Sequence, residues 1–405
     1  MDAFSTLKQK KKKRTLNNSV FTALYTLSVW GLYLLFLPII LLFSFKKKYR
    51  RSIPARFFLW HNPPLPEGRI WFHACSFGET RALKPLIEAL DADEVALTTT
   101  TQTGFEEAKK VAETVRYLPF EPLLWLWVRP QKVLVVMEAE LWYLLFYLAK
   151  RSGAKTMLIN ARISDRSYRS YLRFAWFYRK IFANIDEVYA QSETDKRRLL
   201  ELGAKDVKVT GNIKLAQPAK ATRRYAKPEG IVVTAASTHE GEEEGILDAF
   251  VAWKKRHPDA KLLLVPRHPE RFGKVAAVAE SAAREAGLSF SRWSEEAALD
   301  ADIVLIDAMG ELVNFYAISD IVVLGGAFVP VGGHNPAEVI PFGCRLVSGR
   351  EIFNQKAMFS AVEGAIFCDL ETLETALDRA LEGEPLRLET AVSLEPLFEG
   401  MANVV

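Results

Sequence analysis

The hydrophobic pattern of this chain predicts strands that alternate with helices. From residue 69 onward, apolar runs of four to seven residues alternate with longer stretches whose apolar residues recur at helical spacing. Such alternation is typical of parallel sheets that helices cover on both faces. The strands predicted in the first half are Arg69–Ala74, Glu94–Thr99, Arg116–Leu118, Lys132–Met137, Lys155–Ile159, Glu187–Ala190 and Val207–Thr210. The helices predicted between them are Thr80–Leu90, Gly104–Glu113, Leu141–Arg151, Ser167–Phe182 and Thr194–Leu202.

The alternation pauses after residue 216 and then resumes. The stretch from 217 to 230 carries Pro218 and Pro228 without a sustained apolar run, which indicates a linker. The strands predicted after it are Ile231–Ala235, Lys261–Val265, Ile303–Ile306, Ile321–Leu324, Arg345–Val347 and Ala365–Cys368. We therefore expect an α/β protein with two doubly wound, Rossmann-like domains. The expected parts are a tail and anchor at 1–51, a domain at 52–216, the linker, a domain at 231–380 and a tail at 381–405.

The N-terminal segment predicts a membrane anchor. No charged residue lies between Arg14 and Lys46, and residues 20–45 are mostly apolar. As a helix they would be about 39 Å long at ~1.5 Å per residue, whereas a hydrocarbon core is ~30 Å thick. A cleaved signal peptide has a shorter apolar region, of about 7–15 residues. Six basic residues precede the segment and five follow it, so charge does not orient it. A helix that lies in the membrane plane is the alternative.

Composition excludes several classes of protein. A net charge of +4 over 405 residues argues against a nucleic-acid binder with a basic face. The three cysteines, which have no paired spacing, argue against a disulfide framework and a zinc site. The sequence also lacks a P-loop, a G-x-G-x-x-G motif after a strand, a G-x-S-x-G motif and an H-x-x-x-H pair.

Polar motifs follow the predicted strands of the second half. They are "STHEGEE" (237–243), "PRHPERF" (266–272), "DAMGEL" (307–312) and "GGAFVPVGGHNPAE" (325–338). Open α/β sheets bind ligands at this edge. Arg267 can contact a phosphate by two hydrogen bonds, and Gly310 and Gly333 let backbone amides approach an anion. Asn335 and Glu338 can hold ribose hydroxyls. The pattern predicts a nucleotide phosphate site without a P-loop.

The first half also carries charged residues directly after predicted strands. Glu79 follows a strand in "HACSFGE", Glu138 and Glu140 follow another in "MEAELW", and Lys214 ends the last strand. An acid in the first turn of a helix is also favoured by the helix dipole, by about 0.3–1 kcal/mol. Glu79 is therefore either an acid that only stabilises the first turn of a helix or a carboxylate that faces a ligand. The helix predicted at 167–182 interleaves arginine with aromatic residues. It is either packed in the core with a basic outer face or lies at the level of lipid headgroups.

These motifs, with "TTTTQTG", "NARISDRS", "AQSETD" and "GNIKL", resemble the ordered motifs of the Kdo (3-deoxy-D-manno-oct-2-ulosonic acid) transferases of Gram-negative bacteria. The resemblance runs in the same order from about residue 69 to about residue 345. Two positions depart from the family pattern: Tyr143 stands where the family has proline, and Val339-Ile340 follow "NPAE" where it has small residues.

The resemblance implies the two-domain GT-B glycosyltransferase fold, with a cleft between the domains. It implies transfer of Kdo from CMP-Kdo to a lipid A precursor, lipid IVA, with inversion and without a metal or other cofactor. It makes Glu79 the general base and gives Glu138 and Lys214 the role of stabilising the transition state. It places the CMP contacts on Pro266, Arg267, Met309, Gly310, Glu311, Asn335, Pro336, Ala337 and Glu338.

The resemblance also implies a location, at the inner membrane with the catalytic domains facing the cytosol. The expected partners are CMP-Kdo, the lipid A precursor and the membrane, without nucleic acid. Two other functions fit parts of the pattern. A nucleotide-sugar epimerase could use the same scaffold, but it needs neither an anchor nor an acceptor site. A membrane-tethered binding protein without enzymatic activity would not require Glu79, Glu138 and Arg267 to lie together at one cleft.

Overall fold

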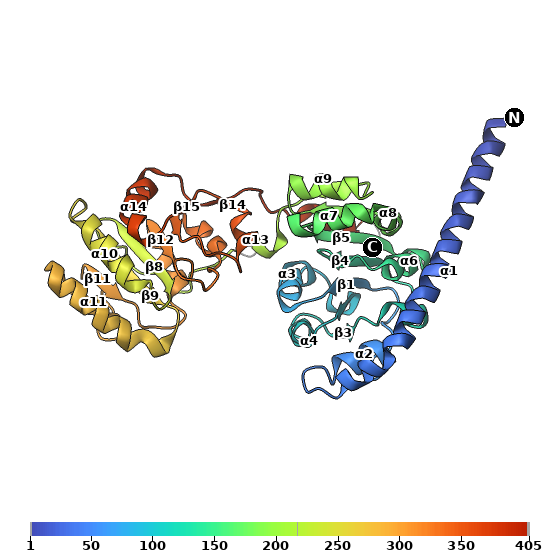
Figure 1. Cartoon of the computed structure of the whole chain (residues 1–405), viewed down its shortest axis with the longest axis horizontal. Helices are drawn as coiled ribbons and strands as arrows, with labels where there is room; N and C mark the ends of the chain where they lie inside the picture. The colour runs from blue at the N-terminus through green and yellow to red at the C-terminus, as the bar shows by residue number, and fades with distance from the viewer. Residues whose placement is uncertain (1, 217, 403–405) are drawn as a thin grey trace. The chain divides into compact units, whose positions relative to one another are not determined.

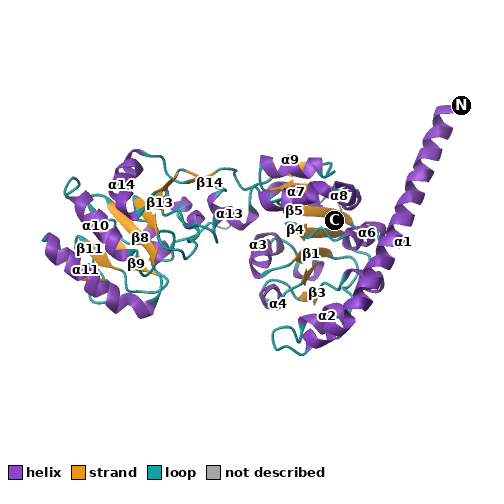
Figure 2. Ribbon diagram, viewed as in Figure 1, coloured by secondary structure: helices purple, strands orange, loops and turns teal. Residues whose placement is uncertain are grey.

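The chain folds into two compact α/β units, each built on one parallel sheet. The computed structural model describes residues 2–216 and 218–402. Unit 1 comprises residues 1–216 and 392–405, and unit 2 comprises residues 217–391. Figures 1 and 2 show a long N-terminal helix, α1 (Asp2–Ser44), which runs beside α2 (Ser52–Phe58) and α6 (Tyr143–Arg151) of unit 1. The fold therefore has the two predicted parallel-sheet domains and the predicted apolar N-terminal helix.

The seven strands of unit 1 have the order β3-β2-β1-β4-β5-β6-β7, and all neighbours are parallel. This order reverses direction between β1 and β4, where doubly wound folds bind their ligands. The strands are β1 (Ile70–Ala74), β2 (Val95–Thr99), β3 (Thr114–Tyr117), β4 (Val133–Met137), β5 (Lys155–Ala161), β6 (Glu187–Ala190) and β7 (Val207–Val209). The helices are α3 (Phe77–Ile87), α4 (Gln102–Ala108), α5 (Leu124–Trp127), α7 (Asp165–Arg173), α8 (Ala175–Phe182), α9 (Glu193–Glu201) and α15 (Glu395–Ala402).

Alternate strand residues of unit 1 point to two separate cores, because successive side chains of a strand face opposite ways. Trp71 and Leu134 pack with α6, α8 and α9 on one face. Phe72 and Val135 pack with α3 and α15 on the other face. Each strand is therefore buried on both sides, which explains why these segments read as continuous apolar runs.

Unit 2 repeats this architecture with the order β10-β11-β9-β8-β12-β13-β15. Its strands are β8 (Val232–Thr238), β9 (Lys261–Pro266), β10 (Phe290–Arg292), β11 (Ile303–Leu305), β12 (Ile321–Leu324), β13 (Arg345–Ser348) and β15 (Ala365–Phe367), with β14 (Val362–Glu363) and β16 (Arg387–Leu388) as a separate antiparallel pair. The helices are α10 (Glu243–Lys254), α11 (Phe272–Ala286), α12 (Leu312–Tyr316), α13 (Lys356–Phe359) and α14 (Leu373–Glu382).

The structure differs from the sequence-based expectation in several places, and one strand of the unit 2 sheet, β10 (Phe290–Arg292), was not predicted. The helix expected at 167–182 is interrupted at Phe174, which leaves helical geometry at φ −107° and ψ 25°, so it forms α7 and α8. The segment expected as a linker belongs to unit 2, where Asn314 Oδ1 accepts hydrogen bonds from the backbone N–H groups of Thr222 (2.8 Å) and Arg223 (3.0 Å). The expected C-terminal tail divides between the units, since α15 returns to unit 1.

Candidate active site

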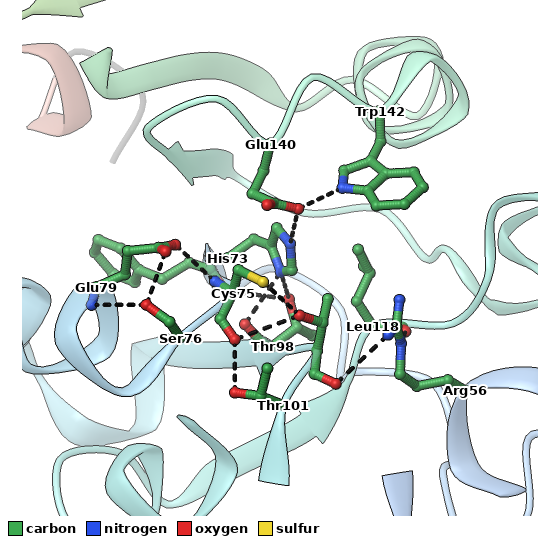
Figure 3. Close-up of polar contacts among 12 residues, drawn as sticks. Arg56, His73, Cys75, Ser76, Glu79, Thr98, Thr101, Leu118, Glu140 and Trp142 are labelled. Atoms are coloured by element: carbon green, nitrogen blue, oxygen red, sulfur yellow. Dashed lines mark hydrogen bonds and ion pairs between the residues drawn. The ribbon is translucent and has the colours of Figure 1, made fainter. Parts of the chain in front are cut away.

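The sequence around Glu79 forms a turn that holds the glutamate at the carboxyl end of β1. Ser76 caps α3, and its Oγ accepts a hydrogen bond of 3.4 Å from the Glu79 N–H. The Glu79 carboxylate in turn accepts bonds of 2.8 Å from the Ser76 hydroxyl and 2.8 Å from the Cys75 N–H (Figure 3). This reciprocal arrangement resembles a capping box. The prediction that Glu79 lies in the first turn of a helix is therefore confirmed, and the capping bonds fix the position of its carboxylate.

Burial gives Glu79 the properties of a base as well. The residue is only 9% exposed. Burial raises the pKa of the Glu79 carboxyl, the hydrogen bonds from Cys75 and Ser76 oppose this, and the charges of Glu138 and Glu140 add to the increase. A carboxylate with a raised pKa accepts a proton more readily than an ordinary one. Capping and proton transfer are compatible, because each carboxylate oxygen has more than one lone pair.

Glu138 and Lys214, to which the resemblance gives a shared role, lie together. Lys214 Nζ forms an ion pair with Glu138 Oε1, and the side-chain amide of Asn160 approaches the same oxygen at 3.4 Å. Glu138 follows β4 and Asn160 lies near the end of β5, and both have positive φ, of 55° and 52°. Such backbone conformations cost energy in non-glycine residues and cluster at functional sites. Asn160 also accepts a hydrogen bond of 3.0 Å from the Ile213 N–H, which fixes the turn that carries Lys214.

Glu140 has different partners from Glu138. Its carboxylate accepts a hydrogen bond of 2.6 Å from the Trp142 indole and lies 3.9 Å from His73 Nε2 (Figure 3). Burial alone would raise the pKa of Glu140, but His73 and Trp142 lower it overall. The two acids of the "EAE" motif are therefore not equivalent: Glu138 pairs with the lysine, and Glu140 with the buried histidine.

A pocket of about 930 Å³ adjoins the start of α3. It is lined by Phe77, by Arg56 of α2, by the segment 100–103 and by Lys48 just after α1, among others. The guanidinium of Arg56 donates to the Leu118 carbonyl at 3.0 Å, and burial lowers its pKa. A second, smaller pocket of about 170 Å³ lies beside Glu138. Unit 1 thus offers space next to its acidic residues.

The residues predicted to form a phosphate site in unit 2 lie where β8, β9, β11 and β12 end. His239 follows β8, and its Nε2 lies 2.9 Å from Nε2 of His334. The ring of His268 stands edge-on to His239, with centroids 5.2 Å apart. Burial lowers the pKa of His334 to about 4, and the positive charge of nearby Arg267 contributes to this. Sequence reasoning did not assign a role to these histidines, although both motifs that carry His239 and His334 follow strands.

A buried glutamate organises the loops of this site. Glu242 accepts hydrogen bonds from the backbone N–H groups of His239 (2.8 Å), Gly326 (2.9 Å) and Phe328 (3.0 Å). It thereby joins the loop after β8 to the loop after β12. Gly325 packs so closely that a Cβ would lie 2.8 Å from the Ser237 carbonyl oxygen.

The remaining predicted contacts differ in how far they are available to a ligand. Arg267, Met309 and Glu338 are exposed, whereas Pro266 and Pro336 are buried. Asn335 caps the turn 336–338 by accepting from the Ala337 N–H at 3.1 Å. Gly310 has φ +82°, which favours glycine. The Glu311 carboxylate is already engaged by Tyr225 (2.7 Å), Asn314 (2.7 Å) and Arg223 (2.9 Å), so its side chain anchors the start of unit 2.

Metal ligands do not assemble at either place. Within residues 2–216 and 218–402, no group of three or more His, Cys, Asp or Glu side chains could hold a metal ion. The part of the chain that the structure describes contains one helical segment, Ser19–Ser44, long and apolar enough to cross a membrane.

Comparison with known proteins gives a consistent result. The family model for 3-deoxy-D-manno-octulosonic-acid transferase (kdotransferase) matches residues 51–217. A 3-deoxy-D-manno-octulosonic acid transferase of Haemophilus influenzae is 33% identical over 363 residues, which cover 83% of each protein. One of Bordetella pertussis is 32% identical over 400 residues, 90% of this chain and 92% of the relative. The crystal structure of the C-terminal CMP-Kdo binding domain of WaaA from Acinetobacter baumannii is 30% identical, covering 38% of this chain and 79% of that domain, with a TM-score of 0.33.

Proposed function

The chain belongs to the 3-deoxy-D-manno-octulosonic acid (Kdo) transferase family, and from this we propose that it transfers Kdo from CMP-Kdo to a lipid A precursor, lipid IVA, with inversion at the sugar. The family assigns it to the glycosyltransferases. The observation that carries the proposal for the mechanism is the geometry of Glu79, a buried carboxylate with a raised pKa at the carboxyl end of β1.

In this proposal Glu79 is the general base. A sugar hydroxyl of the acceptor must lose its proton as it attacks the anomeric carbon, and a positioned carboxylate can take that proton in the transition state. The bonds from Cys75 and Ser76 hold the Glu79 oxygens in place, so little reorganisation is needed when the acceptor binds. A single displacement of this kind inverts the configuration of the sugar carbon.

Glu138 and Lys214 stabilise the transition state in the proposed mechanism. The attacked carbon gains positive charge while the leaving CMP gains negative charge, so a carboxylate and an ammonium beside each other can serve both. Their ion pair and the Asn160 amide keep both side chains oriented before the substrate arrives. Preorganised charges of this kind need no rearrangement during the reaction.

The donor is proposed to bind to unit 2. Arg267 would contact the phosphate, while the backbone around Met309–Glu311 and the segment Asn335–Glu338 would hold the remaining parts of CMP. We add His239 and His334 to this set, because their rings lie together at the same sheet edge and the charge of Arg267 reaches both. CMP leaves with a single phosphate, whose charge these donors can balance, so we expect no metal requirement.

The acceptor is proposed to reach Glu79 from the membrane surface. The pocket of about 930 Å³ runs from Phe77, two residues before Glu79, to Lys48 and Tyr49, which follow the end of α1 at Ser44. It offers both apolar walls and the cations Arg56 and Lys48, which suits a phosphorylated glycolipid. We propose that the protein works at the inner membrane, with the catalytic units on the cytosolic side.

Transfer is tested by incubating the purified full-length protein in detergent with CMP-Kdo and tetraacylated lipid A precursor, followed by mass spectrometry. The expected result is a product heavier by one or more Kdo residues. Parallel reactions with UDP-N-acetylglucosamine test the epimerase alternative. Absence of any Kdo adduct with a protein that binds CMP would overturn the proposal.

A further inference from the structure

Arg162, which follows β5 in unit 1, is half-buried and lines the pocket of about 170 Å³ beside Glu138. Among the residues that the structure describes, the Arg162 guanidinium has no hydrogen-bond or ion-pair partner. Glu138 is paired with Lys214 instead. Asp165, the next acid along the chain, is paired with Arg198. Because arginine binds carboxylates and phosphates readily, this guanidinium is available to an anionic ligand in the pocket.

The backbone that carries Arg162 is held by α9. The Ile163 N–H donates a hydrogen bond of 2.9 Å to Asp195, and the Ile163 carbonyl accepts one of 2.6 Å from Arg198. Ile163 itself is only 2% exposed. Figure 1 shows α9 beside α7, the helix that begins just after this segment. The segment therefore keeps its position while the guanidinium has no partner, an arrangement that is preorganised for a ligand.

An irregularity at the end of β5 precedes this segment. Between Leu158 and Ala161, β5 advances by one residue more than its neighbour β6. Asn160, which lies in this stretch, has φ +52°, and its amide approaches Glu138 at 3.4 Å. Extra residues of this kind redirect side chains and are frequent beside active sites. The residues at the end of β5 thus meet Glu138 in one place, Asn160 by its hydrogen bond and Arg162 in the shared pocket.

The transferred sugar would bring a negative charge to an acidic site. The site proposed for the reaction contains Glu79, Glu138 and Glu140, and the charges of the last two reach Glu79, as their effect on its pKa shows. Of these acids, Glu138 has a lysine partner. In 3-deoxy-D-manno-oct-2-ulosonic acid the carboxylate is attached to the anomeric carbon, which is the atom attacked. Repulsion between like charges is screened less in a partly buried site than in water, so this carboxylate needs a cation of its own.

We propose that Arg162 binds the carboxylate of the transferred sugar, and that this contact selects a sugar acid over an uncharged sugar. A guanidinium can donate two parallel hydrogen bonds to a carboxylate. Ser164 and Ser167 line the same pocket, with their hydroxyls 3.0 Å apart, and add groups that can hydrogen-bond to a polar ligand. The inference rests on the proposed function, because the carboxylate belongs to the proposed donor.

The phosphates of the acceptor are the other anions that Arg162 could bind. The proposed acceptor pocket has its own cations, Arg56 and Lys48. The pocket of Arg162 is smaller and is shared with Glu138, whose proposed role is at the attacked carbon of the sugar. The sugar carboxylate, attached to that carbon, is therefore the anion that this position fits.

The proposal is tested by calorimetry with the full-length wild type and Arg162→Met in detergent. The ligands are CMP, CMP-Kdo and a CMP-Kdo analogue whose sugar carboxylate is replaced by a neutral carboxamide. Wild type should bind CMP-Kdo roughly 10–150-fold more tightly than the carboxamide, the range for a hydrogen bond to a charged group. Arg162→Met should bind the two donors alike, and both proteins should bind CMP equally. A variant that keeps the preference for the carboxylate, or a wild type that has none, would overturn the proposal.

Two variants serve as controls. Arg166→Met makes the same change at an exposed position of α7 outside this pocket and should bind both donors as wild type does. Arg162→Lys keeps the charge without the two-pronged geometry and should recover part of the preference. Melting temperatures should agree, since Arg162 has no partner to lose among the described residues. An equal loss of preference in Arg166→Met would show a general effect of positive charge and contradict the inference.

The transfer assay separates this inference from the proposed function. Absence of Kdo transfer by wild type would overturn the proposed function, whereas transfer without a preference for the carboxylate would overturn this inference alone. An unchanged donor preference in Arg162→Met, together with a raised KM for the lipid A precursor, would place an acceptor phosphate at Arg162 and likewise overturn it.

Discussion

Replacing Glu79 by glutamine separates its two roles, because glutamine keeps the shape of the side chain but cannot accept the proton. Glu79 accepts one hydrogen bond on each oxygen, from Cys75 and Ser76. Glutamine has one acceptor oxygen, so one of these bonds is lost, at about 0.5–1.5 kcal/mol. General-base removal usually lowers turnover by ~10²–10⁴-fold. We therefore expect a large loss of turnover in Glu79→Gln with a small loss of stability.

The stability loss is reduced by the raised pKa of Glu79. Because the folded pKa exceeds the unfolded one, ionisation of Glu79 costs folding free energy at neutral pH. This cost is absent below the unfolded pKa and grows until the pH passes the folded pKa. Glutamine cannot ionise, so this unfavourable contribution to the folding free energy is absent in the variant. At neutral pH its absence partly offsets the stability that is lost with the hydrogen bond.

The assay measures Kdo transfer under single-turnover conditions across a pH series, together with thermal unfolding and CMP binding. In wild type the rate should fall on the acid side, at a pH above that of an ordinary carboxyl. That fall should disappear in the variant, whose CMP affinity should stay normal. Ser76→Ala is the matched control, since it removes a capping bond but leaves the carboxylate. Near-normal turnover in Glu79→Gln, or an equal loss in Ser76→Ala, would leave Glu79 as a capping residue only.

Three further predictions concern other parts of the proposed site. Arg267→Ala should weaken CMP binding by roughly 10–150-fold in calorimetry, since a charged hydrogen bond contributes about 1.5–3 kcal/mol; an unchanged dissociation constant would remove Arg267 from the phosphate site. Lys214→Met should lower the transfer rate by ~10²–10³-fold, as for the removal of other preorganised donors. Lys214→Arg should lower the rate by less, and CMP affinity should be unchanged in both variants. A Lys214→Met rate equal to that of wild type would show that Glu138 needs no cation. The pKa of His334 falls from 6.5 to about 4, so protonation favours the unfolded chain, and thermal stability should decline as the pH falls from about 6.5 towards 4. His334→Asn should show a smaller decline, of about 1–2 kcal/mol less after allowance for partial solvent exposure, and identical pH curves would contradict this.

Local pattern was sufficient to predict the strands of the unit 1 sheet, six of the seven strands of the unit 2 sheet, and the position of Glu79; it missed the short edge strand β10 (Phe290–Arg292), whose residues are only partly buried. Apolar runs mark strands that are buried on both faces, and Ser76 with Glu79 is a short-range capping signal. The roles of Glu138 and Lys214 came from resemblance. The structure adds the contact between them, which joins residues far apart in sequence through Asn160.

Contacts between distant residues explain what the sequence did not reveal. The His239–His334 pair joins positions 95 residues apart, and no periodicity reports such a pair. The break at Phe174 has neither proline nor glycine to signal it. The docking of α1 depends on Glu121, which reads as an ordinary loop acid in the sequence, and only its hydrogen bond with Tyr25 identifies it as part of the helix contact.

The configuration of the transferred sugar tests the central claim most directly. Purified full-length protein is given CMP-Kdo labelled with ¹³C at the anomeric carbon and a detergent-dispersed lipid A precursor, and the product is examined by NMR. Direct attack by a hydroxyl that Glu79 deprotonates predicts a Kdo linkage whose configuration is opposite to that of the donor. A product that retains the donor configuration would contradict a single displacement and the role of Glu79 as its base.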